Sequence, residues 1–293
     1  MNELSNNKLL SPIDQIAYGH NFTPNESASF LAFVEQLQTE SELVQANLAN
    51  NNISLAQQHA NNAAVLLTPN ITREIAAQNQ RVANDLTMAI NDLQDITSSS
   101  SQQQQQQSID QLVSNIDAIL GETVTTRIEQ EQRDNATILA LAFADLVDST
   151  LTNYGNAYAV DFDMTNMSNM IEMGMTGNNM DMGSIDMNSM NIGSMNMSSS
   201  EMMSSEINRN YSLVNATNYQ SAQALAASAQ EIFNTELKPM ALNNSSALVT
   251  NLENGLTELS DSIQRKSSHM DIMMIVHAQI HPSLLEAFKL NLR

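Results

Sequence analysis

The chain has no cysteine and no tryptophan, and its 293 residues include only eight glycines and five prolines. Without cysteine, disulfides, zinc–thiolate centres and thiol nucleophiles are excluded. Aromatic residues make up only 4% of the chain, so the core has to be built from Leu, Ile, Val, Ala and Met. These side chains suit packed helices better than a β-sandwich, and the few glycines and prolines predict long helices with few tight turns.

Positive charge is scarce as well, because 11 basic residues stand against 32 acidic ones and the formal net charge is −21. Nucleic acids and anionic membrane surfaces would be repelled, so neither is expected as a partner. Cations are the natural small partners of such a chain. The alternative interpretation is that the acidity only keeps the protein soluble.

Long apolar runs are also missing. No stretch reaches 18 consecutive apolar residues, so no transmembrane segment is expected. The first ten residues, MNELSNNKLL, contain no secretory hydrophobic region, and no signal segment is visible. We expect either that a signal segment has been removed or that export follows another route.

The chain does contain a series of apolar stripes with helical spacing, several of them preceded by capping residues. Caps are expected at Thr23, Ser54, Thr217 and Ser268. Helices are expected over about 24–50, 54–67, 75–94, 109–121, 125–154, 217–237, 248–263, 268–281 and from 282 onward. Gly121 and Gly155 are expected to end two of them. The sequence therefore predicts an all-α fold, an antiparallel bundle of about eight or nine helices with a disordered Met-rich insertion.

Two stretches of biased composition divide this pattern. Residues 97–108, TSSSSQQQQQQS, are expected to form a flexible Gln/Ser linker. It follows N-terminal helical hairpins over 1–96 and precedes a C-terminal helical bundle over 109–293. That bundle is interrupted at 161–206 by a segment rich in Met, Asn, Ser, Gly and Asp, which has no core periodicity and is expected to be disordered.

The insertion holds thirteen of the nineteen methionines, between Met164 and Met203, many of them spaced M-x-x-M or M-x-M. A thioether is a soft, neutral ligand that suits Cu(I) and is a poor ligand for iron, zinc, calcium or magnesium. The candidate ligands are Met164, Met167, Met170, Met173, Met175, Met180, Met182, Met187, Met190, Met195 and Met197. Two alternatives remain, namely simple-sequence expansion and a methionine surface that packs on a partner.

A second candidate site lies near the C-terminus, where His269, Met273, His277 and His281 follow one another at i, i+4 steps. Neighbours at this spacing lie on one face of a helix and can share an ion, and a His/Met set would suit copper. The alternative is an apolar helix with a few capping histidines. Pro282 disfavours helical geometry at His281.

No catalytic constellation is visible, and the chain is not expected to be an enzyme. His20 and His59 stand alone in the sequence and are interpreted as surface or capping residues. There is no P-loop, no G-x-G-x-x-G and no Ser/His/Asp context. Glu129 and Glu131 lie in a polar stretch and indicate a solvated helix face.

N-x-S/T glycosylation patterns occur eleven times, whereas about six would be expected from this composition. Together with the absence of cysteine, this excess favours an extracytoplasmic location, at the cell surface or secreted. The sequons are at Asn21, Asn25, Asn52, Asn70, Asn135, Asn166, Asn196, Asn210, Asn215, Asn243 and Asn244.

Four segments carry a family resemblance: LANNNISLAQQHANNAAVLL, NATILALAFADLVDSTLTNYGNAY, NYQSAQALAASAQEIF and VHAQIHPSLLEAF. They resemble the extracytoplasmic helical region of the high-affinity iron permease family, as found in ammonia-oxidising archaea. The resemblance implies a helical, metal-associated protein outside the cytoplasm. The Arg-Glu-x-x-Glu helices of the family's membrane domain are missing here, so transport is not implied.

We therefore expect a non-enzymatic metal-binding protein that sequesters or delivers its ion, with Cu(I) favoured by the thioethers over the iron that the resemblance suggests. A membrane permease or another cell-surface protein is a candidate partner. The alternatives are a cell-surface structural or interaction module with an inert Met tract, and a soluble component of an iron-uptake system.

Overall fold

The computed structural model describes residues 26–98, 102–166, 212–241 and 246–290, and these residues form helices without any strand. In chain order the elements are α2 (Glu26–Ala49), α3 (Ile53–Leu66), α4 (Pro69–Gln78), α5 (Gln80–Ser98), α6 (Gln102–Arg127), α7 (Gln130–Arg133), α8 (Ala136–Ala157), α10 (Ala216–Ile232), η5 (Phe233–Leu237), α11 (Lys238–Met240), α12 (Ser246–Gln264), α13 (His269–Met274), η6 (Ile275–Ile280) and α14 (His281–Phe288). The all-α bundle expected from the sequence is confirmed. Within the described ranges, no helix combines the length and hydropathy that a membrane crossing requires.

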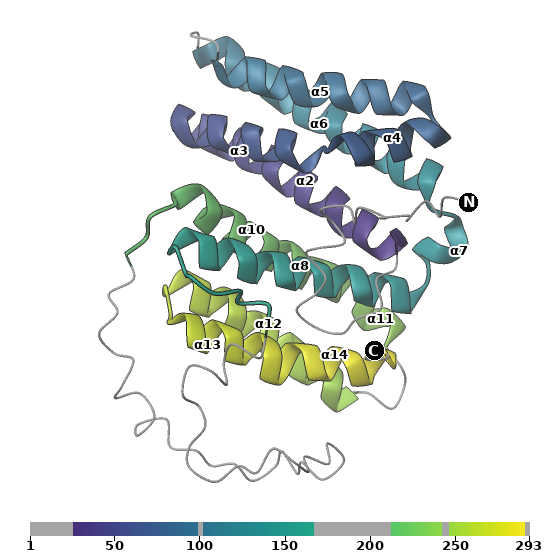
Figure 1. Ribbon diagram of the computed structural model, residues 1–293, viewed down its shortest axis with the longest axis vertical. Helices are drawn as coiled ribbons and strands as arrows, with labels where there is room; N and C mark the ends of the chain where they lie inside the picture. Colours follow the sequence, from purple (N-terminus) through teal and green to yellow (C-terminus); the bar gives the residue numbers. More distant parts are fainter. Residues whose placement is uncertain (1–25, 99–101, 167–211, 242–245, 291–293) are drawn as a thin grey trace, which may run out of the picture.

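The helices are stacked in layers, with α4, α5 and α6 at one end of the molecule, α2 and α3 next, then α8 and α10, and finally α12 to α14 (Figure 1). Two hydrophobic cores follow this order. One lies among α2 to α6 and the other among α8 to α14. We call these groups the N-terminal half and the C-terminal half. Helix α2 packs against both, because apolar residues occur on more than one of its faces.

Of the four helix N-caps expected from capping boxes, one is confirmed, two are replaced by Asn residues, and one lies outside the described residues. The cap at Ser268 is confirmed, because its side chain accepts the backbone N–H three residues on. The caps expected at Ser54 and Thr217 are wrong. Asn52 and Asn215, each two residues earlier, accept the first backbone N–H groups of α3 and α10. The expected cap at Thr23 lies outside the described residues.

Several expected helix limits are also wrong. The tail of the predicted Gln/Ser linker joins the next helix, because residues 102–107 are the first turns of α6. This helix runs through Gly121 to Arg127, and α8 runs through Gly155 to Ala157. A glycine inside a helix costs only about 1 kcal/mol, so packing of the flanking turns can override it. The helix expected over 125–154 instead begins after the Asn135 cap.

Two turns of the C-terminal half are π-helical, and each runs into a proline. The turns η5 and η6 end two residues before Pro239 and Pro282, and the residue before each proline donates its N–H five residues back. In a regular α-helix a proline lacks this donor, and its ring clashes with the carbonyl four residues earlier. A π turn is wider and relieves that clash. The expected loss of helical geometry at His281 is therefore wrong, since its φ is −61° and its ψ is −47°.

The start of the Met-rich insertion belongs to the folded body. Residues 161–166 are described, and Met164 is only 2% exposed within the C-terminal core. Disorder from residue 161 is therefore wrong for these six residues. The rest of the segment up to 206 lies outside the described residues. The segment that precedes α10 contacts the C-terminal end of α8, because the N–H groups of Val214 and Asn215 both donate to the carbonyl of Ala157.

Gly255 marks a close approach of α12 to η6. A Cβ at this position would lie 2.9 Å from Cγ1 of Ile280, a β-branched side chain with little freedom to move. We expect Gly255→Ala to lower the free energy of unfolding by about 1–3 kcal/mol through overpacking. The matched control is Gly121→Ala in α6, where nothing lies within 4 Å of the added Cβ. The control should gain about 0.5–1 kcal/mol from helix propensity. Urea unfolding measures both, and an equal change in the two variants would contradict the prediction.

Candidate metal centre

The structure brings together residues from the two predicted sites. Met164, the first residue of the Met tract, lies against His277, and His281 lies beside His277 with 5.6 Å between the ring centroids. All three residues are buried. The remaining predicted methionines lie outside the described residues, namely Met167, Met170, Met173, Met175, Met180, Met182, Met187, Met190, Met195 and Met197. One centre therefore replaces two separate sites, as far as the described residues extend.

The backbone of Met164 fixes the tautomer of His277. The Nε2 atom of His277 lies 2.9 Å from the carbonyl oxygen of Met164. A carbonyl can only accept a hydrogen bond, so Nε2 carries the proton and the lone pair of the neutral ring is on Nδ1. This is the arrangement by which proteins orient a histidine ligand through its second nitrogen.

His281 faces a buried carboxyl group on α8. Its Nε2 atom lies 3.6 Å from Oδ1 of Asp148, whose side chain is 1% exposed. Burial raises the pKa of Asp148 well above its usual range, and the charge of Asp163 raises it further. This environment favours the protonated form of Asp148, whose carboxyl group lies beside the His281 ring.

Gly155, two turns after Asp148 on α8, makes room for the Met164 side chain. A Cβ at position 155 would lie 3.1 Å from the sulfur of Met164. Any larger residue than glycine at position 155 would have to displace the Met164 thioether. The sulfur is therefore held against α8, while the carbonyl of the same residue holds His277.

The other two residues of the predicted C-terminal site do not join this centre. His269 packs among aromatic rings, with centroid distances of 5.9 Å to Tyr154 and 5.5 Å to Tyr158. Burial lowers the pKa of His269 to about 4, so it is neutral at physiological pH. Met273 is fully buried in the C-terminal core. The expected single row of four ligands is divided, with His269 in an aromatic cluster and His277 and His281 at the candidate metal centre.

The donor types define which ions the centre suits. Within the described part of the chain, no group of three or more His, Asp or Glu side chains is placed to hold a metal ion. The candidate donors that remain are the imidazoles of His277 and His281, whose ring centroids are 5.6 Å apart, and the thioether of Met164, which packs near Gly155. Imidazole with thioether suits copper better than hard cations such as Mg²⁺ or Ca²⁺.

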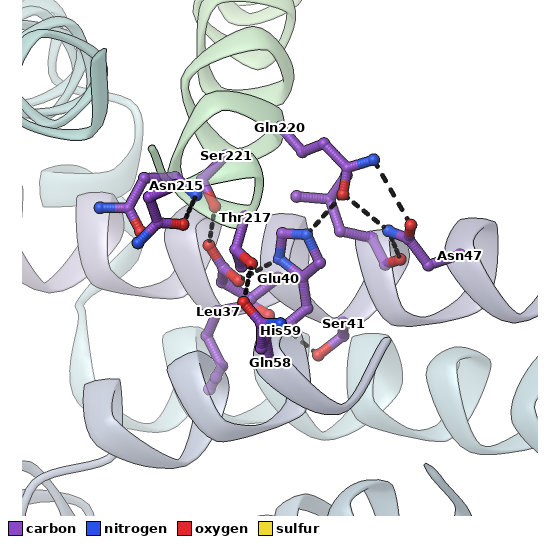
Figure 2. Close-up of polar contacts among 12 residues, drawn as sticks. Leu37, Glu40, Ser41, Asn47, Gln58, His59, Asn215, Thr217, Gln220 and Ser221 are labelled. Carbon is purple, nitrogen blue, oxygen red and sulfur yellow. Dashed lines mark hydrogen bonds and ion pairs between the residues drawn. The ribbon is translucent and has the colours of Figure 1, made fainter. Parts of the chain in front are cut away.

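His59, interpreted from the sequence as a surface or capping residue, is fully buried, and that interpretation is wrong. It lies on α3 between α2 and α10, and both ring nitrogens are engaged (Figure 2). The Nδ1 atom lies 2.7 Å from Oε2 of Glu40, and Nε2 lies 2.8 Å from Oε1 of Gln220. His20, the other isolated histidine, lies outside the described residues.

The polar contacts spread from this pair to neighbouring helices. Ser221 donates to the second carboxylate oxygen of Glu40 at 2.5 Å, and Asn47 donates to Gln220 at 2.9 Å (Figure 2). Thr217 of α10 donates to Gln58 of α3. A buried network of this kind is stable only when every member has a partner. We interpret it as a structural joint of α2, α3 and α10, because it is closed to solvent at its centre.

Sequence reasoning missed Asp148 and Gly155 at the metal centre. A signal for Asp148 exists, because it stands with Asp145 in the most apolar helix of the chain, where a carboxyl group needs a reason to be buried. No signal identifies Gly155, because its role depends on a residue nine positions later in an irregular turn. Comparison of the chain with protein-family models, with curated proteins and with solved structures gives no match.

Proposed function

We propose that this protein binds Cu(I) outside the cytoplasm as a cargo ion, which it sequesters or delivers to another protein. The proposal is supported by the position of Met164, where the Met tract begins: its carbonyl oxygen lies 2.9 Å from His277, and the His281 ring lies beside that of His277. The start of the Met tract and the histidine pair are thus neighbours in the fold, although the two predicted sites are far apart in the sequence. No catalytic step is part of this proposal.

The arrangement supports a route from capture to storage. The methionines after Met164 supply soft ligands that need no deprotonation, so they can take up Cu(I) over a wide pH range. The His277–His281 pair supplies two stronger nitrogen donors in a dry environment. Since the tract enters the body of the protein at this pair, an ion held by the tract needs only a short transfer to reach it.

The recipient in this proposal is a membrane permease or another cell-surface protein. The resemblance to the helical region of iron permeases supports such a setting, and the net charge of −21 favours approach of a cation. A component of an iron-uptake system remains the second candidate. The donor set of two imidazoles and a thioether supports copper over iron.

Anaerobic titration with Cu(I), using a competing chelator, tests the proposal. We expect Met164→Leu, which keeps the bulk and removes the sulfur, to weaken one Cu(I) site by about 10–100-fold or more, the range seen even for outer-shell changes. The matched control is Met88→Leu on α5, because Met88 is 57% exposed and remote from the centre. Its Cu(I) binding should equal that of the unchanged protein.

A second variant separates the tract from the centre. Replacing Met167, Met170 and Met173 by Leu in addition to Met164 should remove further Cu(I) equivalents, with little effect on folding. If Met164→Leu and this fourfold variant both keep full stoichiometry and affinity, those methionines are not ligands. If the protein takes up iron in preference to Cu(I), the second candidate function replaces the first.

A further inference from the structure

The two halves of the protein meet along an interface that several side-chain hydrogen bonds cross. We call this interface, between α2–α3 and α8–α10 with η5, the seam. Its apolar contacts include a small cluster of Ala32, Leu146 and Leu225, while Ala28 of α2 packs in the core of the C-terminal half. Hydrogen bonds across the seam join Ser29 to Asp145, Thr39 to Ser228, Asn47 to Gln220 and Glu40 to Ser221. Interfaces of this composition separate more easily than a continuous hydrophobic core.

Acidic side chains from both halves gather at one edge of the seam. Two adjoining pockets of about 330 and 210 Å³ open there, and Glu35 and Glu236 line both. The N-terminal half contributes Glu35 and Glu42 from α2 and Asp117 from α6. The C-terminal half contributes Glu231 from α10 and Glu236 from η5. Among the described residues that line the pockets, Arg133 of α7 is the one cation.

We propose that this edge is a proton-controlled joint, in which the two halves stay close when Glu35 is protonated and separate along the α2–η5 edge when Glu35 ionises. The physical basis is like-charge repulsion across a polar seam. Ionised Glu35 faces Glu231 and Glu236 on the opposite half, and Glu42 and Asp117 on its own half. None of these residues belongs to the metal centre, so the inference stands apart from the proposed function.

The direction of the pH response follows from the environment of Glu35. Burial, followed by the charges of Glu236, Glu42, Glu231 and Asp117 in that order, raises its pKa to about 7. The folded, closed state therefore binds this proton more tightly than a state in which Glu35 meets water. The stabilisation is complete below the usual glutamate pKa and is lost as the pH rises through about 7. The joint is closed in mildly acidic conditions and opens above neutrality.

A distance measurement tests the joint, and the absence of native cysteine makes site-specific labelling simple. Spin labels on Ala118→Cys in α6 and Asn234→Cys in η5, both exposed positions, report across the acidic edge. We expect the longer-distance population to grow between pH 6 and 8, by up to about tenfold per pH unit, the limit for release of one proton. In Glu35→Gln, which cannot ionise, the distance distribution should be the same at both pH values and match the closed form.

Glu258→Gln is the matched control, because Glu258 is exposed on α12, away from the seam. It should show the pH response of the unchanged protein. If Glu35→Gln fails to fold, Glu236→Gln removes the facing charge and should shift the opening to higher pH. A distance distribution that does not change from pH 6 to 8, or one that still changes in Glu35→Gln, overturns the proposal.

Discussion

Replacing His59 by leucine is expected to lower the free energy of unfolding by about 3–5 kcal/mol, because it leaves the buried Glu40 carboxyl group without its hydrogen-bonded partner. The side chain is fully buried, and its loss would leave Glu40, itself 6% exposed, without the donor 2.7 Å away. Gln220 would lose its contact as well. Urea or thermal unfolding followed by circular dichroism measures the change.

The double variant His59→Leu with Glu40→Met tests whether the loss comes from the stranded carboxylate. Replacing both members of a buried pair by apolar residues is often close to neutral, so the double variant should be more stable than His59→Leu alone. A double-mutant cycle then gives the coupling energy of the pair. If His59→Leu unfolds at the same urea concentration as the unchanged protein, the network does not join the helices in the way described.

Cu(I) binding is expected to separate by pH into two components. A site made by His277 and His281 should weaken by about 10²–10³-fold from pH 6.5 to 5, because two imidazoles with the usual pKa of about 6.5 each take up a proton over this range. Binding by thioethers alone should change little, because a thioether has no proton to lose. Competition titrations with a Cu(I) chelator at several pH values measure both components.

Two variants assign the components. Changing His277 and His281 to Gln together should leave only the pH-independent binding. A chain with residues 167–211 deleted should keep only the pH-dependent binding, and the deletion is feasible because Val214 and Asn215 are already bound to the end of α8. Binding to the unchanged protein that does not vary with pH, or a histidine variant that still responds to pH, would remove the histidines from the site.

The bundle could be predicted from the sequence because apolar residues repeat with helical spacing in every described helix longer than two turns. The predicted first and last residues of the helices were less accurate where two possible capping residues lie close together. Ser54 and Thr217 complete capping patterns, yet Asn52 and Asn215 cap the helices, since Asn is at least as good an N-cap as Ser or Thr and stands earlier in the chain. Gly121 does not end α6, because the turn after it contributes Thr123 to the buried side.

The position of the candidate metal centre could be predicted only in part. Met164, His277 and His281 were proposed as ligands from their chemistry, and that role stays a prediction. The sequence contains no information that a turn after α8 brings Met164 to His277. The expected partnership of His269 with His277 failed for a local reason. Eight residues separate them, and a π-helical turn intervenes, so they do not lie on one regular helical face.

The excess of N-x-S/T patterns has a partly structural explanation. Asn52, Asn135 and Asn215 are each the N-cap of a helix, and their side chains accept backbone N–H groups. The Asn of each of these three patterns thus has a structural role, so the patterns carry less weight for an extracytoplasmic location than their number suggests.

The π turn η6 and Pro282, which follows it, limit which single-residue deletions this part of the chain can tolerate. A π turn holds one residue more than an α-helical turn, so removing one residue from η6 would restore a regular helix and rotate everything after it by about 100°. That deletion would place Pro282 in the interior of a regular helix, at a cost of about 3 kcal/mol. A regular helix could acquire both features only if the residue that forms the π turn was inserted before the proline appeared. Once the proline is present, it prevents the insertion from being lost, and the orientation of His281 toward Asp148 is preserved with it.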